Sequence, residues 1–350
     1  MKAAFLEVKE WEREYLKERL PGHEFYFSGE RLQGDMLPQL RDFQVLSPFI
    51  YSRVTGEAVQ ALPSLQLVTT RSTGFDHVDV GACAARGIAV ANVPSYGENT
   101  VAEHSFALML ALSRKIHQSY LRAQRGDFSL TGLTGFDLKG KTLGVVGAGK
   151  IGLHVIKIGR GFGMSVLAYD PYRNPFLAEL LSFRYVEMDE LLAASDIVTL
   201  HMPYRPALEH FMDREKFRRM KPGALFINTA RGHLVDTDAL LEALQSGRLA
   251  GAGLDVVEGE ELIQEEEQLL YAQDQRMEKL QAVVRTHVLF RHEKVIFTPH
   301  NAFNSKEALE RILETTIENI LAFERGQPIN LVKAPGPVPS GAPAAAKQTS

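Results

Sequence analysis

Short apolar runs alternate with helix-like stretches along most of the chain. In the first hundred residues the apolar runs have the length of buried strands, and amphipathic stretches at 12–20 and 56–62 separate two pairs of them. The runs cover residues 3–8, 43–50, 67–70 and 88–92. Strands that alternate with helices predict a parallel α/β unit.

Residues 99–116, NTVAEHSFALMLALSRKI, predict one strong helix. Asn99 or Thr100 can cap it, Glu103 falls in its first turn, and apolar positions nearly encircle it. A helix this apolar is buried on most sides. It therefore either crosses between domains or contacts a second subunit, or it is a core helix of one domain, and the pattern favours neither.

A second alternating series follows the helix. Its six apolar runs are 143–146, 166–169, 197–200, 225–228, 252–256 and 295–298. Six strands with helices between them predict a doubly wound sheet, so the expected fold class is α/β with two parallel-sheet domains of Rossmann-like or flavodoxin-like type.

Two segments depart from this alternation. Residues 261–293 begin acidic and become helix-like, and the pattern leaves open whether this insert is a lid, an oligomer contact or a decoration with a solvated face. Residues 334–350 are rich in Pro, Ala, Gly and Ser, a composition that cannot bury enough apolar surface to fold. We expect a disordered tail there.

Composition narrows the possible partners. The 39 basic and 43 acidic residues give a net charge of −4, and the chain has no long basic run, which argues against nucleic acid as a binding partner. One cysteine, Cys83, excludes an internal disulfide and a thiol pair for a metal, and no metal site is expected. No apolar run approaches the roughly 20 residues of a membrane span. Charged residues are spread along the first twenty positions, which leaves no apolar stretch for a signal peptide. We expect a cytoplasmic protein without a membrane partner.

The run 143–146 leads directly into GAGKIG at 147–152 and then into a helical stretch. This is GxGxxG in the strand, turn and helix context of a dinucleotide site. Gly147 permits the tight turn, Gly149 lets the backbone approach a pyrophosphate, and Gly152 lets the helix lie close to the strand. The helix N-terminus then offers free N–H groups to the phosphates.

Asp170 follows the next predicted strand, eighteen residues after Gly152. A carboxylate there accepts hydrogen bonds from ribose hydroxyls and repels a 2′-phosphate, which favours NAD over NADP. Arg173 could pair with such a phosphate, but we do not expect it to.

Three polar residues follow buried strands at what should be one edge of the second sheet, namely Arg231, Glu260 and His300. A cation and a proton donor are what hydride transfer to a 2-oxo acid needs. A carboxylate beside the imidazole favours the charged ring. Alternatives remain, because Arg231 could form a structural ion pair, Glu258 and Glu261 flank Glu260, and His287 and His292 lie near His300.

The segments NTARG (228–232), DTDA (236–239), GLDVVEGE (253–260) and TPHNAF (298–303), with the Gly147 loop, resemble the D-2-hydroxyacid dehydrogenase family up to about Val332. NVPSY (92–96) and the aromatic Phe303 are similar to its D-lactate dehydrogenase branch.

The resemblance implies a substrate domain of residues 1–98 plus 301–333, an NAD-binding domain of residues 99–300, and an active site in the cleft between them. It implies that Arg231 binds the substrate, that His300 is the general acid/base and that Glu260 pairs with His300. The implied substrate contacts are Tyr96, Ser72, Thr73, Gly74, Phe303 and Phe49. The implied cofactor contacts are Gly147, Gly149, Lys150, Ile151, Gly152, Asp170, His201, Pro203, Thr229, Ala230 and Asp255.

The function expected from this resemblance is NAD-dependent reduction of pyruvate. The apolar pattern of residues 99–116 makes them the expected contact of a homodimer. Larger 2-oxo acids or phosphoglycerate are alternative substrates, and an NAD-sensing corepressor is the alternative from another class. The chain contains neither GxxxxGK[ST] nor HExxH, so no kinase or zinc-peptidase motif competes.

Overall fold

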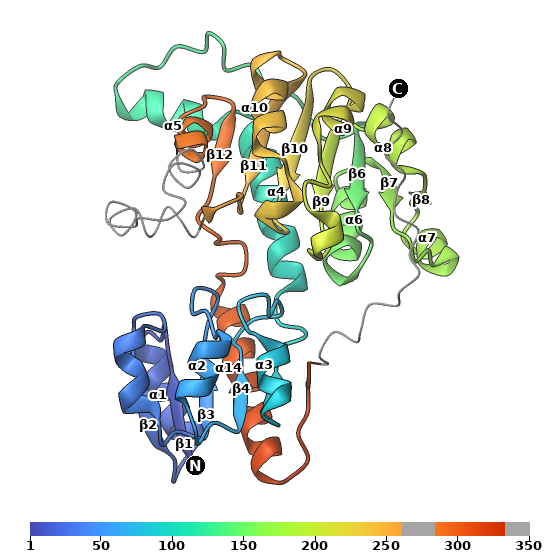
Figure 1. The fold of residues 1–350 in the computed structure, drawn as a ribbon. Helices are drawn as coiled ribbons and strands as arrows, with labels where there is room; N and C mark the ends of the chain where they lie inside the picture. The colour runs from blue at the N-terminus through green and yellow to red at the C-terminus, as the bar shows by residue number, and fades with distance from the viewer. Residues whose placement is uncertain (261–283, 333–350) are drawn as a thin grey trace, which may run out of the picture. The chain divides into compact units, whose positions relative to one another are not determined.

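The computed structural model describes residues 1–260 and 284–332, and it divides into two compact units (Figure 1). One unit comprises Met1–Tyr96 with the chain from Lys306, and the other comprises Gly97–Ser305. Each contains one parallel sheet. This confirms the predicted fold class, whereas the assignment of a substrate and a cofactor domain stays a prediction.

The sheet of the first unit has, among the described residues, five parallel strands in the order β2-β1-β3-β4-β5. They are β1 (Lys2–Phe5), β2 (Glu24–Phe27), β3 (Val45–Ser47), β4 (Leu67–Thr69) and β5 (Ala89–Ala91). Sequence patterning missed β2, because this edge strand is half-exposed along its length and shows no buried run. The strand order reverses between β1 and β3, which is where ligands bind in sheets of this type.

Helices cover both faces of this first sheet. They are α1 (Glu10–Arg19), α2 (Gly56–Ala61), α3 (Val80–Ala85) and α14 (Lys306–Glu324), with a 3₁₀ helix η1 (Gly34–Leu40). Alternate residues of β1 serve the two faces: Ala3 and Phe5 pack with α1 and α14, while Ala4 packs with α2 and α3. The period-two pattern of the strand thus fixes the three-layer arrangement.

The sheet of the second unit has seven parallel strands in the described part of the chain, in the order β12-β11-β10-β9-β6-β7-β8. They are β6 (Thr142–Val146), β7 (Ser165–Tyr169), β8 (Arg184–Tyr185), β9 (Ile197–Leu200), β10 (Ala224–Asn228), β11 (Leu249–Leu254) and β12 (Val295–Phe297). Six of these were predicted. The seventh, β8, is a two-residue edge strand, too short to leave an apolar run.

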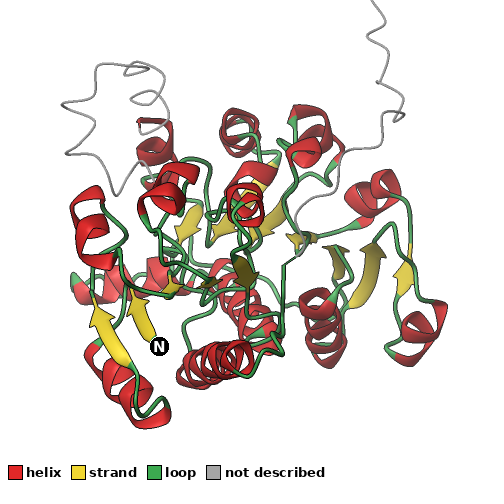
Figure 2. Ribbon diagram, turned by 60° about the horizontal axis from the view of Figure 1, so that its bottom comes forward, coloured by secondary structure: helices red, strands yellow, loops and turns green. Residues whose placement is uncertain are grey.

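Helices again lie on both faces of the sheet (Figure 2). They are α4 (Glu98–Ser113), α5 (Ile116–Gln124), α6 (Lys150–Gly161), α7 (Pro175–Leu180), α8 (Met188–Ala194), α9 (Arg214–Arg219) and α10 (Thr237–Gln245), with the short 3₁₀ helices η2 (Pro206–Leu208) and η3 (Gly232–Leu234). One core layer joins α4 and α6 to the sheet, and the other joins α8, α9 and α10.

The apolar helix is a core helix of the second unit, because α4 packs on α6, β10 and β11. Its predicted limits were wrong. It begins at Glu98, after Gly97, so neither Asn99 nor Thr100 caps it and Glu103 lies beyond its first turn. It ends at Ser113 because Lys115 takes a left-handed conformation (φ 51°), and the separate helix α5 follows.

Two further predictions fall on other parts of the chain. The tail at 334–350 and most of the insert at 261–293 lie outside the described residues. Over the described ranges, 1–260 and 284–332, the helices are all too short or too polar to cross a membrane.

Candidate active site

The Gly147 loop joins β6 to α6 at the point where the strand order of the second sheet reverses, between β6 and β9. Gly147 has φ 96°, and a Cβ atom there would lie 2.6 Å from the carbonyl oxygen of His201. A Cβ atom at Gly152 would lie 2.0 Å from the carbonyl oxygen of Gly147. Both positions therefore require glycine for the fold itself.

Gly149 differs from these two glycines. It has ordinary backbone angles (φ −74°), and among the described residues no heavy atom lies within 4 Å of the place where its Cβ would be. It immediately precedes α6, whose first N–H groups face the phosphates in sites of this type. The fold does not use the space above Gly149, which fits a pyrophosphate lying against the backbone.

This difference predicts that two alanine substitutions differ in their effect on stability. Gly152→Ala should lower the melting temperature and also weaken cofactor binding, because its Cβ atom would clash with the backbone of Gly147. Gly149→Ala should leave the melting temperature near wild type yet weaken dinucleotide binding about tenfold or more, because the methyl group takes the ligand's space. Thermal unfolding and fluorescence titration measure both. Unchanged binding by a stable Gly149→Ala would place the phosphates elsewhere.

Asp170 follows β7 and accepts two backbone hydrogen bonds. Its Oδ2 accepts from Ala148 N at 2.8 Å, and its Oδ1 accepts from Tyr172 N at 2.7 Å. A carboxylate oxygen can accept more than one hydrogen bond, so both oxygens keep capacity for ribose hydroxyls. Arg173 donates to Glu187 at 2.5 Å and is thus already paired with a carboxylate.

The ring of His201, just after β9, is neutral, and one of its buried nitrogens is available to a ligand. Nε2 lies 2.9 Å from Thr199 Oγ1, whereas Nδ1 is buried and meets no hydrogen-bond partner in the part of the chain described. Part of the residue reaches the surface, but burial of the ring lowers the pKa of His201 to about 3. An orphaned buried nitrogen at the switch point of the sheet fits a ligand there.

The other predicted cofactor contacts also lie at this carboxyl edge. Lys150 and Ile151 open α6, and Pro203 is exposed in the loop after β9. Thr229 and Ala230 follow β10 and are buried, with Thr229 Oγ1 placed 2.9 Å from Ser105 Oγ of α4. The edge as a whole suits a dinucleotide, and the individual contacts remain predictions.

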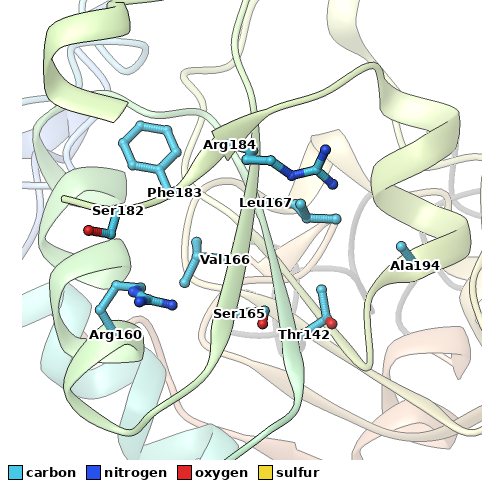
Figure 3. Close-up of a pocket in the computed structure, with 9 residues that line it drawn as sticks. All are labelled: Thr142, Arg160, Ser165, Val166, Leu167, Ser182, Phe183, Arg184 and Ala194. Carbon is cyan, nitrogen blue, oxygen red and sulfur yellow. The ribbon is translucent and has the colours of Figure 1, made fainter. Parts of the chain in front are cut away.

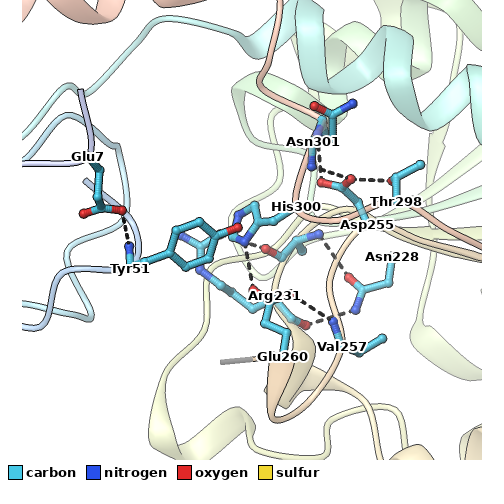
Figure 4. Close-up of polar contacts among 12 residues, drawn as sticks. Glu7, Tyr51, Asn228, Arg231, Asp255, Val257, Glu260, Thr298, His300 and Asn301 are labelled. Atoms are coloured by element: carbon cyan, nitrogen blue, oxygen red, sulfur yellow. Dashed lines mark hydrogen bonds and ion pairs between the residues drawn. The ribbon is translucent and has the colours of Figure 1, made fainter. Parts of the chain in front are cut away.

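Arg231, Glu260 and His300 follow the three neighbouring strands β10, β11 and β12 (Figure 4). His300 Nδ1 lies 2.8 Å from Glu260 Oε1, and both side chains are 22 % exposed. Arg231 Nη1 donates to the carbonyl oxygen of Ala230 at 2.7 Å. The structure thus brings the three predicted residues to one edge and leaves Nε2 as the ring nitrogen of His300 that Glu260 does not hold.

The backbone at His300 is strained. Its φ is 48°, a left-handed value that residues other than glycine rarely take. Its N–H donates to the carbonyl oxygens of Asp255 and Thr298, each at 2.9 Å. Strain of this kind persists where surrounding structure enforces it, and it gathers at functional sites.

Asp255 enforces this conformation. Its carboxylate is 1 % exposed and accepts from Asn301 N at 2.8 Å, Ala302 N at 2.9 Å and Thr298 Oγ1 at 2.5 Å. Burial alone would raise the pKa of the Asp255 carboxyl, but hydrogen bonds from His104, Thr298 and the backbone outweigh it and hold the pKa below its usual range. Asp255 thus orders the loop that carries His300, and its predicted contact with the cofactor stays a prediction.

His104 of α4 supports the same loop from beneath. Its Nε2 lies 2.9 Å from Thr298 Oγ1. Thr298 has one hydroxyl hydrogen, which it donates to Asp255, so it must accept from His104. The support that Thr298 gives was not predicted, because residues so far apart in sequence give no local signal.

Gly232 was also missed, although it directly follows Arg231 in NTARG. A Cβ atom there would lie 2.1 Å from the carbonyl oxygen of Val257, so the loop after β10 packs on the loop that leads to Glu260. Asn228 secures the first of these loops, donating to Arg231 O and accepting from Ala230 N, both at 3.0 Å.

The alternatives to Glu260 and His300 have other partners. Glu258 Oε1 pairs with His210 Nε2 at 2.9 Å, which engages it away from His300. His292 Nδ1 accepts from Lys294 N at 3.2 Å, and His287 packs edge-on against Phe290. Glu261 lies outside the described residues. Geometry therefore selects the pair Glu260 and His300.

The predicted substrate contacts of the first unit gather at the carboxyl edge of its own sheet. Ser72 Oγ donates to Gly74 O at 2.6 Å, and Thr73 Oγ1 donates to Val93 O at 2.7 Å. Tyr96 O accepts from Arg311 Nε at 2.5 Å. In the second unit, the ring of Phe303 lies 6.4 Å from that of His300, edge-on. Their contacts with substrate stay predictions.

A surface pocket of about 380 Å³ lies at the opposite edge of the second sheet (Figure 3). Thr142 and Ser165, which line it, are the first residues of β6 and β7. The Gly147 loop and Asp170 follow the last residues of the same strands. This pocket is therefore separate from the predicted chemistry.

Comparisons with known proteins agree with this geometry. Residues 106–302 match the family model described as "D-isomer specific 2-hydroxyacid dehydrogenase, NAD binding domain". The chain is 37 % identical to a 2-hydroxyacid dehydrogenase homolog of Haemophilus influenzae over 93 % of its own length and 97 % of the relative. It is 34 % identical to D-lactate dehydrogenase of Escherichia coli, covering 93 % and 98 %. The structure of D-lactate dehydrogenase from Aquifex aeolicus, complexed with NAD and lactic acid, superposes with a TM-score of 0.83 at 34 % identity, covering 95 % of this chain and 100 % of that one.

Proposed function

Because the chain belongs to the D-isomer specific 2-hydroxyacid dehydrogenase family and carries its NAD-binding domain, we propose that it is a D-lactate dehydrogenase that reduces pyruvate with NADH. The observation that carries the proposal is the His300–Glu260 pair at 2.8 Å, one strand away from Arg231. In this proposal His300 is the proton donor and Arg231 the cation, on the carboxyl edge that also bears the Gly147 loop.

In the proposed reaction, a reduced nicotinamide, when bound, would supply a hydride to the carbonyl carbon of the substrate. Arg231 binds the substrate carboxylate and polarises the carbonyl group, which stabilises the charge that develops on oxygen. His300 donates its Nε2 proton to that oxygen, so the product is the 2-hydroxy acid. Glu260 holds Nδ1 and thereby fixes the orientation of the ring.

Two observations favour a small substrate. The aromatic ring of Phe303 beside His300 gives this side of the site a compact apolar surface. Relatives similar along nearly the whole chain include D-lactate dehydrogenases. Larger 2-oxo acids and phosphoglycerate remain the alternatives, and an NAD-sensing protein without turnover is the alternative of another class.

Initial rates of NADH oxidation test the proposal. Pyruvate should give the highest kcat/KM among pyruvate, 2-oxobutyrate, 2-oxoisocaproate, phenylpyruvate and hydroxypyruvate. A larger acid in first place would keep the enzyme class and replace the substrate. No turnover of any acid, together with tight NADH binding, would favour the sensor.

Cofactor preference provides a further prediction. Asp170→Ala should weaken NADH binding and reduce the preference for NADH over NADPH about tenfold or more, because the carboxylate that repels a 2′-phosphate is removed. Asp170→Asn is the matched control, since it removes the charge but keeps the size. Measuring kcat/KM with both cofactors decides, and an unchanged ratio in both variants would show that Asp170 does not contact the ribose.

We further propose a homodimer, with its contact surface revised. Most of α4 is buried within its own unit, which leaves little of residues 99–116 for a partner. Exposed apolar side chains instead gather on α5 and just after it, with Phe128 82 % and Leu130 80 % exposed. Exposed apolar residues grouped in this way are typical of protein interfaces. Sedimentation equilibrium should give a dimer that Phe128→Ser with Leu130→Ser weakens, and a monomeric wild type would refute this surface.

We also propose a cytoplasmic location. The chain's one cysteine, Cys83, is buried and free, and burial raises the pKa of its thiol to about 11. A chain without a disulfide pair suits a reducing compartment. Fractionation of cells that express the protein would test this location.

A further inference from the structure

Glu7 stands at the carboxyl end of β1, at the point where the strand order of the first sheet reverses between β1 and β3. In open α/β sheets, the loops on either side of this point form the ligand site. Residues 49–52 follow β3 and so form the other side of it. No sequence pattern indicates a role for Glu7.

The side chain of Glu7 holds residues 49–52 through three hydrogen bonds. Its Oε2 accepts from Phe49 N at 3.1 Å, and its Oε1 accepts from Tyr51 N at 3.0 Å (Figure 4). Its Oε2 also accepts from the hydroxyl of Ser52, which is fully buried. Both carboxylate oxygens are thus used to fix one short loop.

The backbone of Glu7 is itself strained. Its φ is 54°, which is unusual for a residue with a long side chain. The conformation is held on both sides, because Glu7 N donates to Glu30 O at 3.1 Å and Glu7 O accepts from Arg71 Nη2 at 3.2 Å. A strained conformation fixed by its surroundings points to a functional constraint.

Arg71 holds the same loop through a cation–π contact with the ring of Phe49. The guanidinium carbon of Arg71 lies 5.5 Å from the ring centroid of Phe49, and Arg71 is only 2 % exposed. Phe49 is therefore fixed twice, by its N–H on Glu7 and by its ring on Arg71. Free rotation of residue 49 would need both contacts to break.

We propose that Glu7 is a positioning residue, which sets the shape of residues 49–52 and thereby the size of the 2-oxo acid side chain that the enzyme accepts. The inference rests on the proposed function, and it takes Phe49, an expected substrate contact, as part of the wall around that side chain. Glu7 does not touch the substrate in this account and acts through the loop.

Glu7→Gln tests the role because it keeps the size of the side chain. An amide turns one acceptor oxygen into a donor, which then faces a backbone N–H of residue 49 or 51. The ratio of kcat/KM for pyruvate to that for 2-oxoisocaproate should fall about tenfold, mainly through a higher KM for pyruvate. The dissociation constant of NADH should not change. Glu18→Gln, at an exposed position of α1 in the same unit, is the matched control and should behave as wild type.

Hydrogen exchange gives a readout that needs no turnover. In Glu7→Gln, the amides of Phe49 and Tyr51 should exchange at least about tenfold faster, while amides of β1 and β3 stay protected. If the wild type reduces no 2-oxo acid, the proposed function fails, and exchange alone still decides whether Glu7 orders the loop. Unchanged exchange overturns the inference. So does an equal loss of kcat/KM for all acids, which would mean a structural role only.

Discussion

His300→Ala should lower kcat for pyruvate reduction at least about a hundredfold, while the dissociation constant of NADH stays close to that of the wild type. The reason is chemical, because removing the ring removes the proton that the developing alkoxide receives. The cofactor loop follows β6, several strands away from β12, so truncating His300 should not disturb it. Steady-state rates and fluorescence titration of NADH measure the two quantities.

A matched control separates loss of chemistry from loss of fold. His154 lies exposed on α6 in the same unit, and His154→Ala should keep both rate and melting temperature. Since His300 takes a left-handed backbone conformation, an alanine there keeps some of that strain without the compensating bond to Glu260. A variant with near-normal turnover would refute the acid/base assignment, whatever its stability.

The fold was predictable wherever a strand is buried on both faces. Every residue of β9 and β10 is buried, and so is every residue of β6 after Thr142. The edge strands β2 and β8 were missed because half-exposed residues leave no such run. The break between α4 and α5 was missed because Lys115 carries no sequence signal for a positive φ.

The site was predictable where a polar residue closely follows an apolar strand run. Arg231 and His300 satisfy this condition, and the edge of a parallel sheet brings them together. The supports of the site could not be found in the same way. Asp255 and Thr298 meet 43 positions apart, and Glu7 and Tyr51 meet 44 positions apart, so only the folded chain shows these hydrogen bonds.

These supports share one design on the two units. In each, a carboxylate after one strand, Asp255 or Glu7, fixes the loop after a neighbouring strand by accepting backbone N–H groups. In each unit, one residue of this arrangement takes a strained left-handed backbone conformation. It is Glu7 itself in the first unit, and in the second it is His300, which lies in the loop that Asp255 orders. Hydrogen bonds to a charged acceptor are strong enough to offset strain of about 1–3 kcal/mol. In each unit the carboxylate thus fixes the conformation of a loop at the carboxyl edge of the sheet.

Arg231→Gln should lower kcat/KM for pyruvate about a thousandfold, which corresponds to about 4 kcal/mol of lost transition-state stabilisation. Arginine presents a planar fork that matches a carboxylate, and the same cation stabilises the charge on the carbonyl oxygen as hydride arrives. Glutamine retains a hydrogen-bond donor but neither the charge nor the fork. Both KM and kcat should therefore suffer, in contrast to His300→Ala, whose effect falls mainly on kcat.

Arg231→Lys distinguishes charge from geometry. Lysine keeps the positive charge but has no fork, so an intermediate loss of about tenfold to a hundredfold is expected. The backbone of the loop should hold in both variants, because Asn228 binds the main chain of residues 230 and 231 and not the side chain of Arg231. Melting temperatures close to wild type would verify this. If Arg231→Gln retained most of its kcat/KM, the cation would have no contact with the substrate, and the guanidinium would serve only to order the loop after β10.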